Sequence, residues 1–209
     1  IDGIVRAKDY VYVVTNGDGI FAFHAETGEV EDWENQVTTS VHSIGYSSER
    51  DLVFYGTGAK TVGSIRALQI DPNTGAPMSE LSNGGWSESA IPTVEPAAVW
   101  SIAVNEALSE LYIGTNSREV YRVSIDTGVV VGEPVENLGL TVEALALNGD
   151  RLFIGSDKLY AVNIENDGSF TQGFALDTVG NIYSTTATAD TLFVTGSFSE
   201  IAGIARAGL

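Results

Sequence analysis

The sequence predicts an all-β fold built from repeats of about 40 residues. One observation is an aromatic strand motif that recurs at spacings of 42, 58, 41 and 40 residues, with its aromatic at Tyr12, Phe54, Tyr112, Phe153 and Phe193. A second is the alternation of apolar with small or polar residues around these positions, the period-2 pattern of strands. A third is the composition, with 23 glycines and only 18% charged residues. Together they predict a β-propeller of about five four-stranded blades, with the fifth blade incomplete at the C-terminus.

Each repeat is expected to begin with an inner strand that leads through a hairpin into the aromatic strand. The third position of this first strand is always small, which suits a crowded place where repeats converge, and its residues are Gly3, Ser43, Ser101, Ala144 and Ser184. In the fourth repeat, Asn148-Gly149 is a preferred pair for a type I′ turn, in which both residues have positive φ. The aromatics of the second strand are expected to form the core of the blades.

A third strand and a glycine turn follow the aromatic strand in four repeats. These third strands are expected at residues 20–26, 65–71, 120–126 and 159–165. The turns after them pair Asp, Asn or Glu with a glycine in the left-handed conformation. The outer fourth strand varies most, and residues 30–33 are its clearest copy. The repeats of this single predicted domain span residues 1–39, 40–97, 98–140, 141–180 and 181–209.

The third strands also carry a family resemblance. Leu159-Tyr160-Ala161-Val162 and Phe23-His24-Ala25-Glu26-Thr27-Gly28, with Trp33 beyond, resemble the blade repeat of quinoprotein-type propellers. The tail, residues 192–209, is similar to repeats of large bacterial secreted and surface proteins. The resemblance implies a repeat type and a secreted or cell-surface location, but no activity. It also implies that the fifth repeat stops after two strands, so that further sequence or a partner completes it or the chain self-assembles.

Composition excludes several classes of function. The net charge of −18 argues against nucleic-acid binding, which needs clustered Lys and Arg. The acidity serves solubility, with a high-salt environment or cation capture as the alternatives. The chain has no cysteine and therefore no disulfide or thiolate metal site. No stretch approaches the roughly 18 apolar residues of a membrane helix, so no membrane insertion is expected.

Motifs for catalysis and metal binding are scarce. The sequence has no Gly-x-Ser-x-Gly elbow, HExxH motif, Walker loop or Cys nucleophile. His24 is interpreted as an ordinary polar strand residue. Asn16-Gly17-Asp18-Gly19 and Asn166-Asp167-Gly168 loosely resemble Ca²⁺ loops but lack the alternating oxygen ligands of an EF-hand, so they are interpreted as turns. No cofactor is predicted, with Ca²⁺ at these turns as the alternative.

The second position of each first strand is the best candidate for a ligand-binding site. This position varies in type and carries aromatic and ionisable residues, namely Asp2, His42, Trp100, Glu143 and Tyr183. Because first strands line the axis of a propeller, these side chains are expected to converge at one mouth of the channel. Aromatic and carboxylate groups together bind sugars, by stacking on a ring face and by accepting hydroxyl hydrogen bonds. The alternative is a polar channel lining filled by water.

The long second repeat supplies one more candidate. The Gly- and Pro-rich stretch between Asp71 and Val99 is typical of an inserted binding loop, and Trp86 is its anchor or, alternatively, a cover packed on the blade. The predicted function is a non-enzymatic extracellular interaction module that binds glycan or protein through one face of the propeller. The alternatives are an extracellular enzyme domain acting on sugars or alcohols at the channel mouth, and an architectural subunit of a surface layer, filament or particle.

Overall fold

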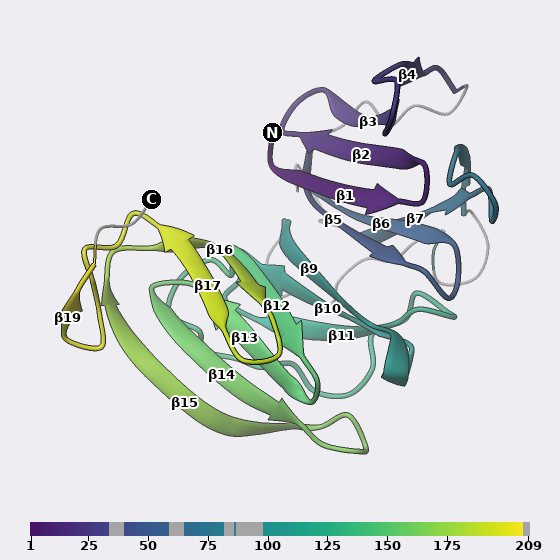
Figure 1. Ribbon diagram of the computed structural model, residues 1–209. Coiled ribbons are helices and arrows are strands. Elements are labelled where there is room, and N and C mark those ends of the chain that lie inside the picture. The colour runs from purple at the N-terminus through teal and green to yellow at the C-terminus, as the bar shows by residue number, and fades with distance from the viewer. Residues whose placement is uncertain (34–39, 59–64, 82–85, 87–97, 207–209) are drawn as a thin grey trace.

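The structure, a computed structural model, describes residues 1–33, 40–58, 65–81, 86 and 98–206. These residues form antiparallel β-sheets with very little helix, such as the 3₁₀ turn Glu106–Leu108, which confirms the predicted all-β class (Figure 1). The first two sheets are four-stranded meanders. One contains β1 (Gly3–Ala7), β2 (Tyr10–Thr15), β3 (Gly19–His24) and β4 (Val30–Glu31), and the other contains β5 (Val41–Ser47), β6 (Leu52–Thr57), β7 (Ile65–Ile70) and β8 (Pro77–Glu80).

The later sheets depart from this regular pattern. The third has β9 (Val99–Asn105), β10 (Glu110–Thr115) and β11 (Val120–Ser124), and beyond β11 isolated bridges from Val130 and Val135 replace a fourth strand. The fourth has β12 (Ala144–Asn148), β13 (Arg151–Gly155), β14 (Lys158–Ile164) and β15 (Phe170–Val179). A two-stranded sheet, β16 (Ile182–Ala187) and β17 (Leu192–Gly196), ends the series. In the part of the chain that the structure describes, no helix is long and apolar enough to cross a membrane.

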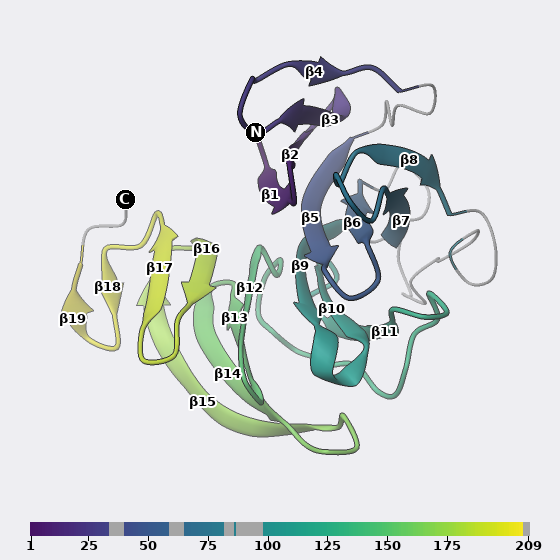
Figure 2. The ribbon, with the colours of Figure 1, turned by 45° about the vertical axis from the view of Figure 1, so that its right-hand side comes forward.

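The first strands of successive sheets lie against one another. β1 contacts β5, β5 contacts β9, β9 contacts β12, and β12 contacts β16. The sheets therefore follow one another along an arc whose inner side carries the first strands and whose outer side carries β4, β8 and β15 (Figure 2). Small third-position residues make this approach close. Ser43 Oγ donates a hydrogen bond to Val99 O at 3.1 Å, and Ser101 Oγ donates to Val142 O at 2.9 Å, so each serine ties its strand to the next first strand.

Apolar clusters fill the spaces between neighbouring sheets, and the three largest lie between the first four sheets. The first packs Trp33 with residues of the first two sheets, the second packs Trp86 with residues of the second and third, and the third joins Tyr112 to residues of the fourth sheet. Four of the five repeated aromatics are buried, as expected of core residues. Phe193 is the exception, with 54% of its surface exposed. The expectation was wrong for Phe193 because its sheet has only two described strands, so less structure packs over it.

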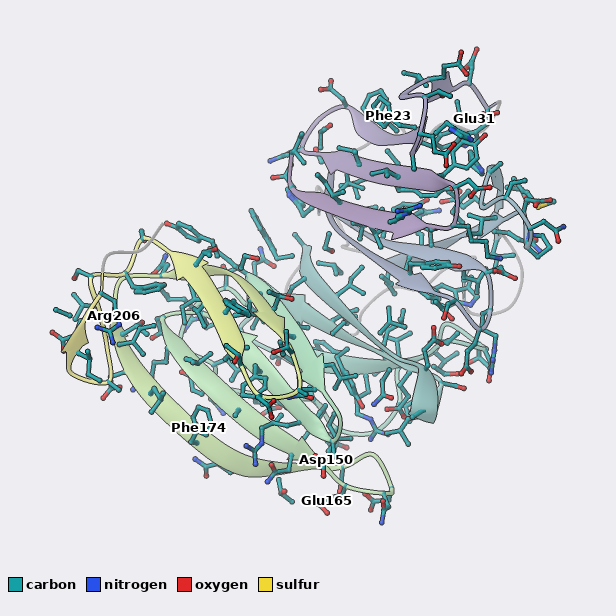
Figure 3. The ribbon with its side chains drawn as sticks, in the orientation of Figure 1. Phe23, Glu31, Asp150, Glu165, Phe174 and Arg206 are labelled. Atoms are coloured by element: carbon teal, nitrogen blue, oxygen red, sulfur yellow. The ribbon has the colours of Figure 1, made fainter. Side chains whose placement is uncertain are left out.

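The chain after β17 takes a course that the repeat pattern did not predict. Instead of continuing beside β17, it forms a small hairpin of β18 (Glu200–Ile201) and β19 (Ile204–Ala205). β18 pairs with the end of β15, through Thr178↔Ile201 and Val179↔Glu200, so the hairpin extends the fourth sheet. Arg206, just beyond β19, lies near this end of β15 (Figure 3). Residues 207–209, at the end of the predicted fifth repeat, lie outside the described residues.

The type I′ turn predicted at Asn148-Gly149 does not form, and the turn of the fourth repeat lies one residue later in the chain. Asn148 pairs with Arg151, so Gly149 and Asp150 occupy the centre of the turn. Gly149 has a φ of 61°, whereas neither Asn148 nor Asp150 is among the residues with positive φ. The prediction was wrong because the register of the two strands, which the core side chains set, decides which residues lie in the loop.

A repeated glycine in the second strand allows the sheets to approach. A Cβ atom built on Gly56, Gly114 or Gly155 would lie closer than 3.0 Å to a side chain at or just before the next inner strand. These side chains are Val99 of β9, Val142 two residues before β12, and Ile182 of β16. None of the three glycines has a positive φ, so packing and not backbone strain requires them. The glycine of the repeated "aromatic-x-Gly" pattern is thus required by the close packing of one sheet on the next.

Gly114→Ala tests this contact. The added methyl group would meet Ser101 Oγ and Val142 Cγ1, and overpacking of this kind costs about 1–3 kcal/mol. Urea denaturation should show the loss as a lower midpoint with an unchanged slope. The double variant Gly114→Ala/Ser101→Gly removes one of the two clashing groups and should recover part of the loss. A Gly114→Ala protein as stable as the wild type would show that the sheets move apart freely.

Candidate functional site

The second-position residues of the first strands surround one pocket of about 320 Å³. Asp2 directly precedes β1, His42 is the second residue of β5, Trp100 the second of β9 and Tyr183 the second of β16, while Glu143 directly precedes β12. All five line this pocket. They meet because they occupy the same place in strands that lie side by side. Ser43 and Ser101 also line the pocket, and their hydrogen bonds to the backbone of the next repeat fix the spacing of the neighbouring strands there.

An aromatic pair forms one wall of the pocket. The rings of His42 and Trp100 are stacked, with centroids 4.4 Å apart and planes 16° from parallel. His42 is buried, whereas Trp100 is half-buried and keeps part of its indole exposed. One face of the indole therefore packs against the imidazole ring of His42, which orients the indole and leaves part of its surface exposed.

Three buried polar atoms in the pocket lining lack a hydrogen-bond partner. They are His42 Nδ1, Trp100 Nε1 and Thr185 Oγ1, three of the five such side-chain atoms in the part of the chain that the structure describes. Buried polar atoms without partners are rare in folded proteins because leaving each one unpaired costs about 1–3 kcal/mol. Their concentration in one pocket indicates a place that a hydrogen-bonding ligand or ordered water completes.

The charged groups of the pocket are acidic. Asp2 and Glu143 supply two carboxylates, and no Lys or Arg is found among the described residues of the lining. Asp2 Oδ2 accepts a hydrogen bond of 2.7 Å from the backbone N–H of Asn16, which positions this carboxylate at the rim. Such a lining disfavours anionic ligands and favours neutral or cationic ones.

Burial shifts the pKa values of the two titratable groups deeper in the pocket. Desolvation raises the pKa of Glu143 above its ordinary value of 4.5. Desolvation lowers the pKa of His42 below 6.5, and the nearby Asp2 carboxylate opposes this shift only in part. Burial therefore favours the neutral form of His42, whose Nδ1 is buried without a hydrogen-bond partner.

Glu143→Gln is expected to stabilise the protein in a pH-dependent way. A carboxyl group whose pKa is raised by folding contributes fully below its unfolded pKa, and this contribution is lost as the pH rises through the folded value. The variant should therefore match the wild type below pH 4.5 and become the more stable of the two as the pH approaches 7. Urea denaturation at several pH values measures the difference. A difference that shrinks as the pH rises would contradict the burial of this carboxylate.

Trp86 does not join the pocket. Its side chain is 3% exposed, packs against Phe54 with ring centroids 5.2 Å apart, and donates a hydrogen bond of 3.2 Å from Nε1 to Ile125 O. This placement corresponds to the alternative of a cover packed on the sheets, since a ligand would find little of the ring accessible. The flanking residues 82–85 and 87–97 of the predicted insertion lie outside the described residues.

The other candidates from the sequence also lie outside the pocket lining. His24 is on β3, where its Nδ1 accepts a hydrogen bond of 3.4 Å from the N–H of Thr27. At the two Ca²⁺-like turns, Thr15 Oγ1 accepts from the N–H of Asp18, and Asp167 Oδ1 accepts from the N–H and hydroxyl of Ser169. Over the described ranges, no three His, Asp or Glu side chains are grouped so that they could hold a metal ion.

Sequence reasoning missed two features of chemical interest. One is Thr185, two residues after Tyr183 on β16, whose hydroxyl is one of the unpartnered atoms of the pocket lining. The other is a buried ion pair between Glu110 and Arg122. Arg122 faces Tyr112 across the β10–β11 pair, where the corresponding residues of the other sheets are Ala22, Ala67 and Ala161. The repeat alignment contained this signal, because only one repeat places a charge at that position.

Comparison with known proteins supports the fold and no activity. No protein-family model matches the sequence, and no curated protein matches it. Among solved structures, the crystal structure of the computationally designed Ika8 protein is similar, with a TM-score of 0.62 and 11% sequence identity. The match covers 99% of this chain and 59% of the designed one, so the chain spans little more than half the length of that protein.

Proposed function

We propose that this chain is a β-propeller module of about five blades that binds a neutral sugar residue of a glycan in the pocket at its first strands. Support for the propeller arrangement comes from the repeated antiparallel sheets and from the succession of contacts between their first strands. We propose a secreted or cell-surface setting on the strength of the repeat resemblance.

The observation that carries the proposal is the combination of a stacked aromatic wall with unpartnered polar atoms in one acidic pocket. The indole N–H of Trp100 only donates, so its partner must accept a hydrogen bond, while the carboxylates of Asp2 and Glu143 need donors. A sugar hydroxyl does both. An ammonium group cannot accept from Trp100, and an anion would be repelled by the carboxylates. A pyranose ring also has the flat apolar face that packs on an indole.

A binding screen tests the proposal directly. Neutral, acidic and amine-bearing oligosaccharides are immobilised on an array, and hits are confirmed by isothermal titration calorimetry with the free saccharide. Saturable binding of neutral glycans, with weaker binding of their acidic analogues, is the expected result. If amines alone bind, or if binding follows charge and not sugar identity, the sugar assignment is wrong. If no saccharide binds, the proposed function is overturned.

The raised pKa of Glu143 favours a second candidate, hydrolysis of a glycosidic bond with this residue as general acid. A buried carboxyl group with a raised pKa holds its proton to a higher pH than an exposed one, as a general acid requires, and Asp2 is the second carboxylate of the same pocket. Release of reducing ends from a bound oligosaccharide would reveal such turnover. Glu143→Gln should then abolish release while leaving binding in place, whereas a pure binding module releases nothing in either form.

A further inference from the structure

A second and larger pocket lies between the third and fourth sheets, away from the first strands. It measures about 580 Å³ and is bounded by the segment 132–138 on one side and by β14 and β15 on the other. It shares no lining residue with the first-strand pocket. Its wall is apolar and aromatic, with Val135, Leu138, Tyr160, Phe170 and Phe174. Phe174, on β15 at the outer side of the fourth sheet, is 37% exposed, so this wall reaches the surface (Figure 3).

The neighbouring contacts between sheets indicate which group this space suits. Trp33 is buried between the first and second sheets, and Trp86 is buried between the second and third, where it packs on Phe54. The core between the third and fourth sheets has no tryptophan among its described members. There Phe170 packs on Tyr112 at a centroid distance of 5.7 Å, and the pocket remains beside it. Phe170 thus holds on Tyr112 the place that Trp86 holds on Phe54, and an aromatic-lined space remains open beside it.

The charges at this pocket are arranged to attract a cation. At its inner end, Arg122 is neutralised by Glu110 and lies 6.0 Å from the centroid of Phe170. At the rim, Glu133 and Glu136 are both exposed, and neither forms an ion pair with a residue that the structure describes. A ligand that inserts an apolar ring would therefore meet two free carboxylates at the entrance, within a chain of net charge −18.

We propose that this pocket binds a tryptophan side chain of a partner protein, presented by a peptide segment with lysine or arginine on either side. The ring packs against the aromatic wall beside Phe170, and the basic neighbours pair with Glu133 and Glu136. An aromatic anchor in a desolvated pocket, with charge complementarity at the rim, is the usual anatomy of a binding hot spot. This site is independent of glycan binding in the first-strand pocket.

The test uses an acetylated, amidated pentapeptide with one Trp flanked by two Lys on each side. Titration calorimetry and ¹⁵N-HSQC spectra of the whole chain should show saturable binding, with shifts confined to β14, β15 and the segment 132–138. The same peptide with Ala in place of Trp should bind at least tenfold more weakly, and so should one with Glu in place of Lys. Gln172→Trp, which fills the pocket from β15, should lower the affinity at least tenfold.

Val179→Trp is the matched control, because it adds the same side chain to an exposed position at the far end of β15, outside the pocket lining. It should change the affinity less than twofold, and circular dichroism with thermal unfolding verifies that both variants are folded. Equal binding of the Trp and Ala peptides, undiminished binding to Gln172→Trp, or no binding at all would each overturn the proposal. Self-association that Gln172→Trp abolishes, without peptide binding, would instead identify a second copy as the occupant and also overturn it.

Discussion

Glu110→Ala is expected to lower the free energy of unfolding by about 3–5 kcal/mol, the usual cost of removing one partner of a buried ion pair. Arg122 Nε and Nη2 donate to the two carboxylate oxygens of Glu110 at 3.0 and 2.5 Å, and the two side chains are 7% and 10% exposed. Once Glu110 is removed, the guanidinium stays buried without its counter-charge. Chemical denaturation at pH 7 measures the loss, which is a large part of the 5–15 kcal/mol typical of a folded protein.

The double variant Glu110→Leu/Arg122→Ala separates the cost of an unpaired charge from the value of the pair. It copies the second sheet, where Leu52 and Ala67 occupy the corresponding positions. Replacing a whole buried pair by apolar residues is often nearly neutral, so the double variant should recover at least half of the stability lost in the single one. If the single and double variants are equally unstable, packing of the aliphatic stems and not charge is what matters. If Glu110→Ala unfolds like the wild type, the pair is not buried in solution.

Trp100→Ala is expected to weaken glycan binding about thirtyfold, which corresponds to about 2 kcal/mol for loss of an aromatic anchor. The change removes the surface on which a sugar ring packs and the Nε1–H that now lacks a protein partner. Calorimetry with the tightest neutral saccharide from the screen is the measurement. Trp100→Phe helps to separate the two contributions, because it keeps a smaller aromatic ring beside His42 and removes the donor. Its affinity should therefore fall between those of the wild type and the alanine variant.

Two comparisons show whether the effect belongs to the pocket. Tyr183→Ala should have a smaller effect, because the tyrosine is 50% exposed and lies at the open end of the row of first strands. Met78→Ala removes a side chain of similar exposure from β8, at the outer edge of the second sheet, and should leave binding unchanged. Glycan affinity within twofold of the wild type in Trp100→Ala would exclude this wall as the binding surface.

Much of the strand pattern was predictable because strand formation is read from local features. Apolar alternation and glycine turns placed the third strands of four repeats within a residue or two of β3, β7, β11 and β14. The same alignment placed Asp2, His42, Trp100, Glu143 and Tyr183 in equivalent positions, and the structure groups them around one pocket. Equivalent positions in adjacent repeated strands are neighbours in space, so no long-range information was needed to expect them together.

The sequence by itself determined the β class, the repeat and the identity of the five second-position residues. Only the tertiary structure decided that Trp86 is buried, that β18 and β19 pair with β15, and that the aromatic Phe193 is exposed although four equivalents are core. It also decided which polar atoms lack partners and where a pocket remains between sheets. The reason is that period and turn chemistry act between near neighbours in the chain, whereas burial, hydrogen-bond satisfaction and unfilled space depend on which distant segments meet.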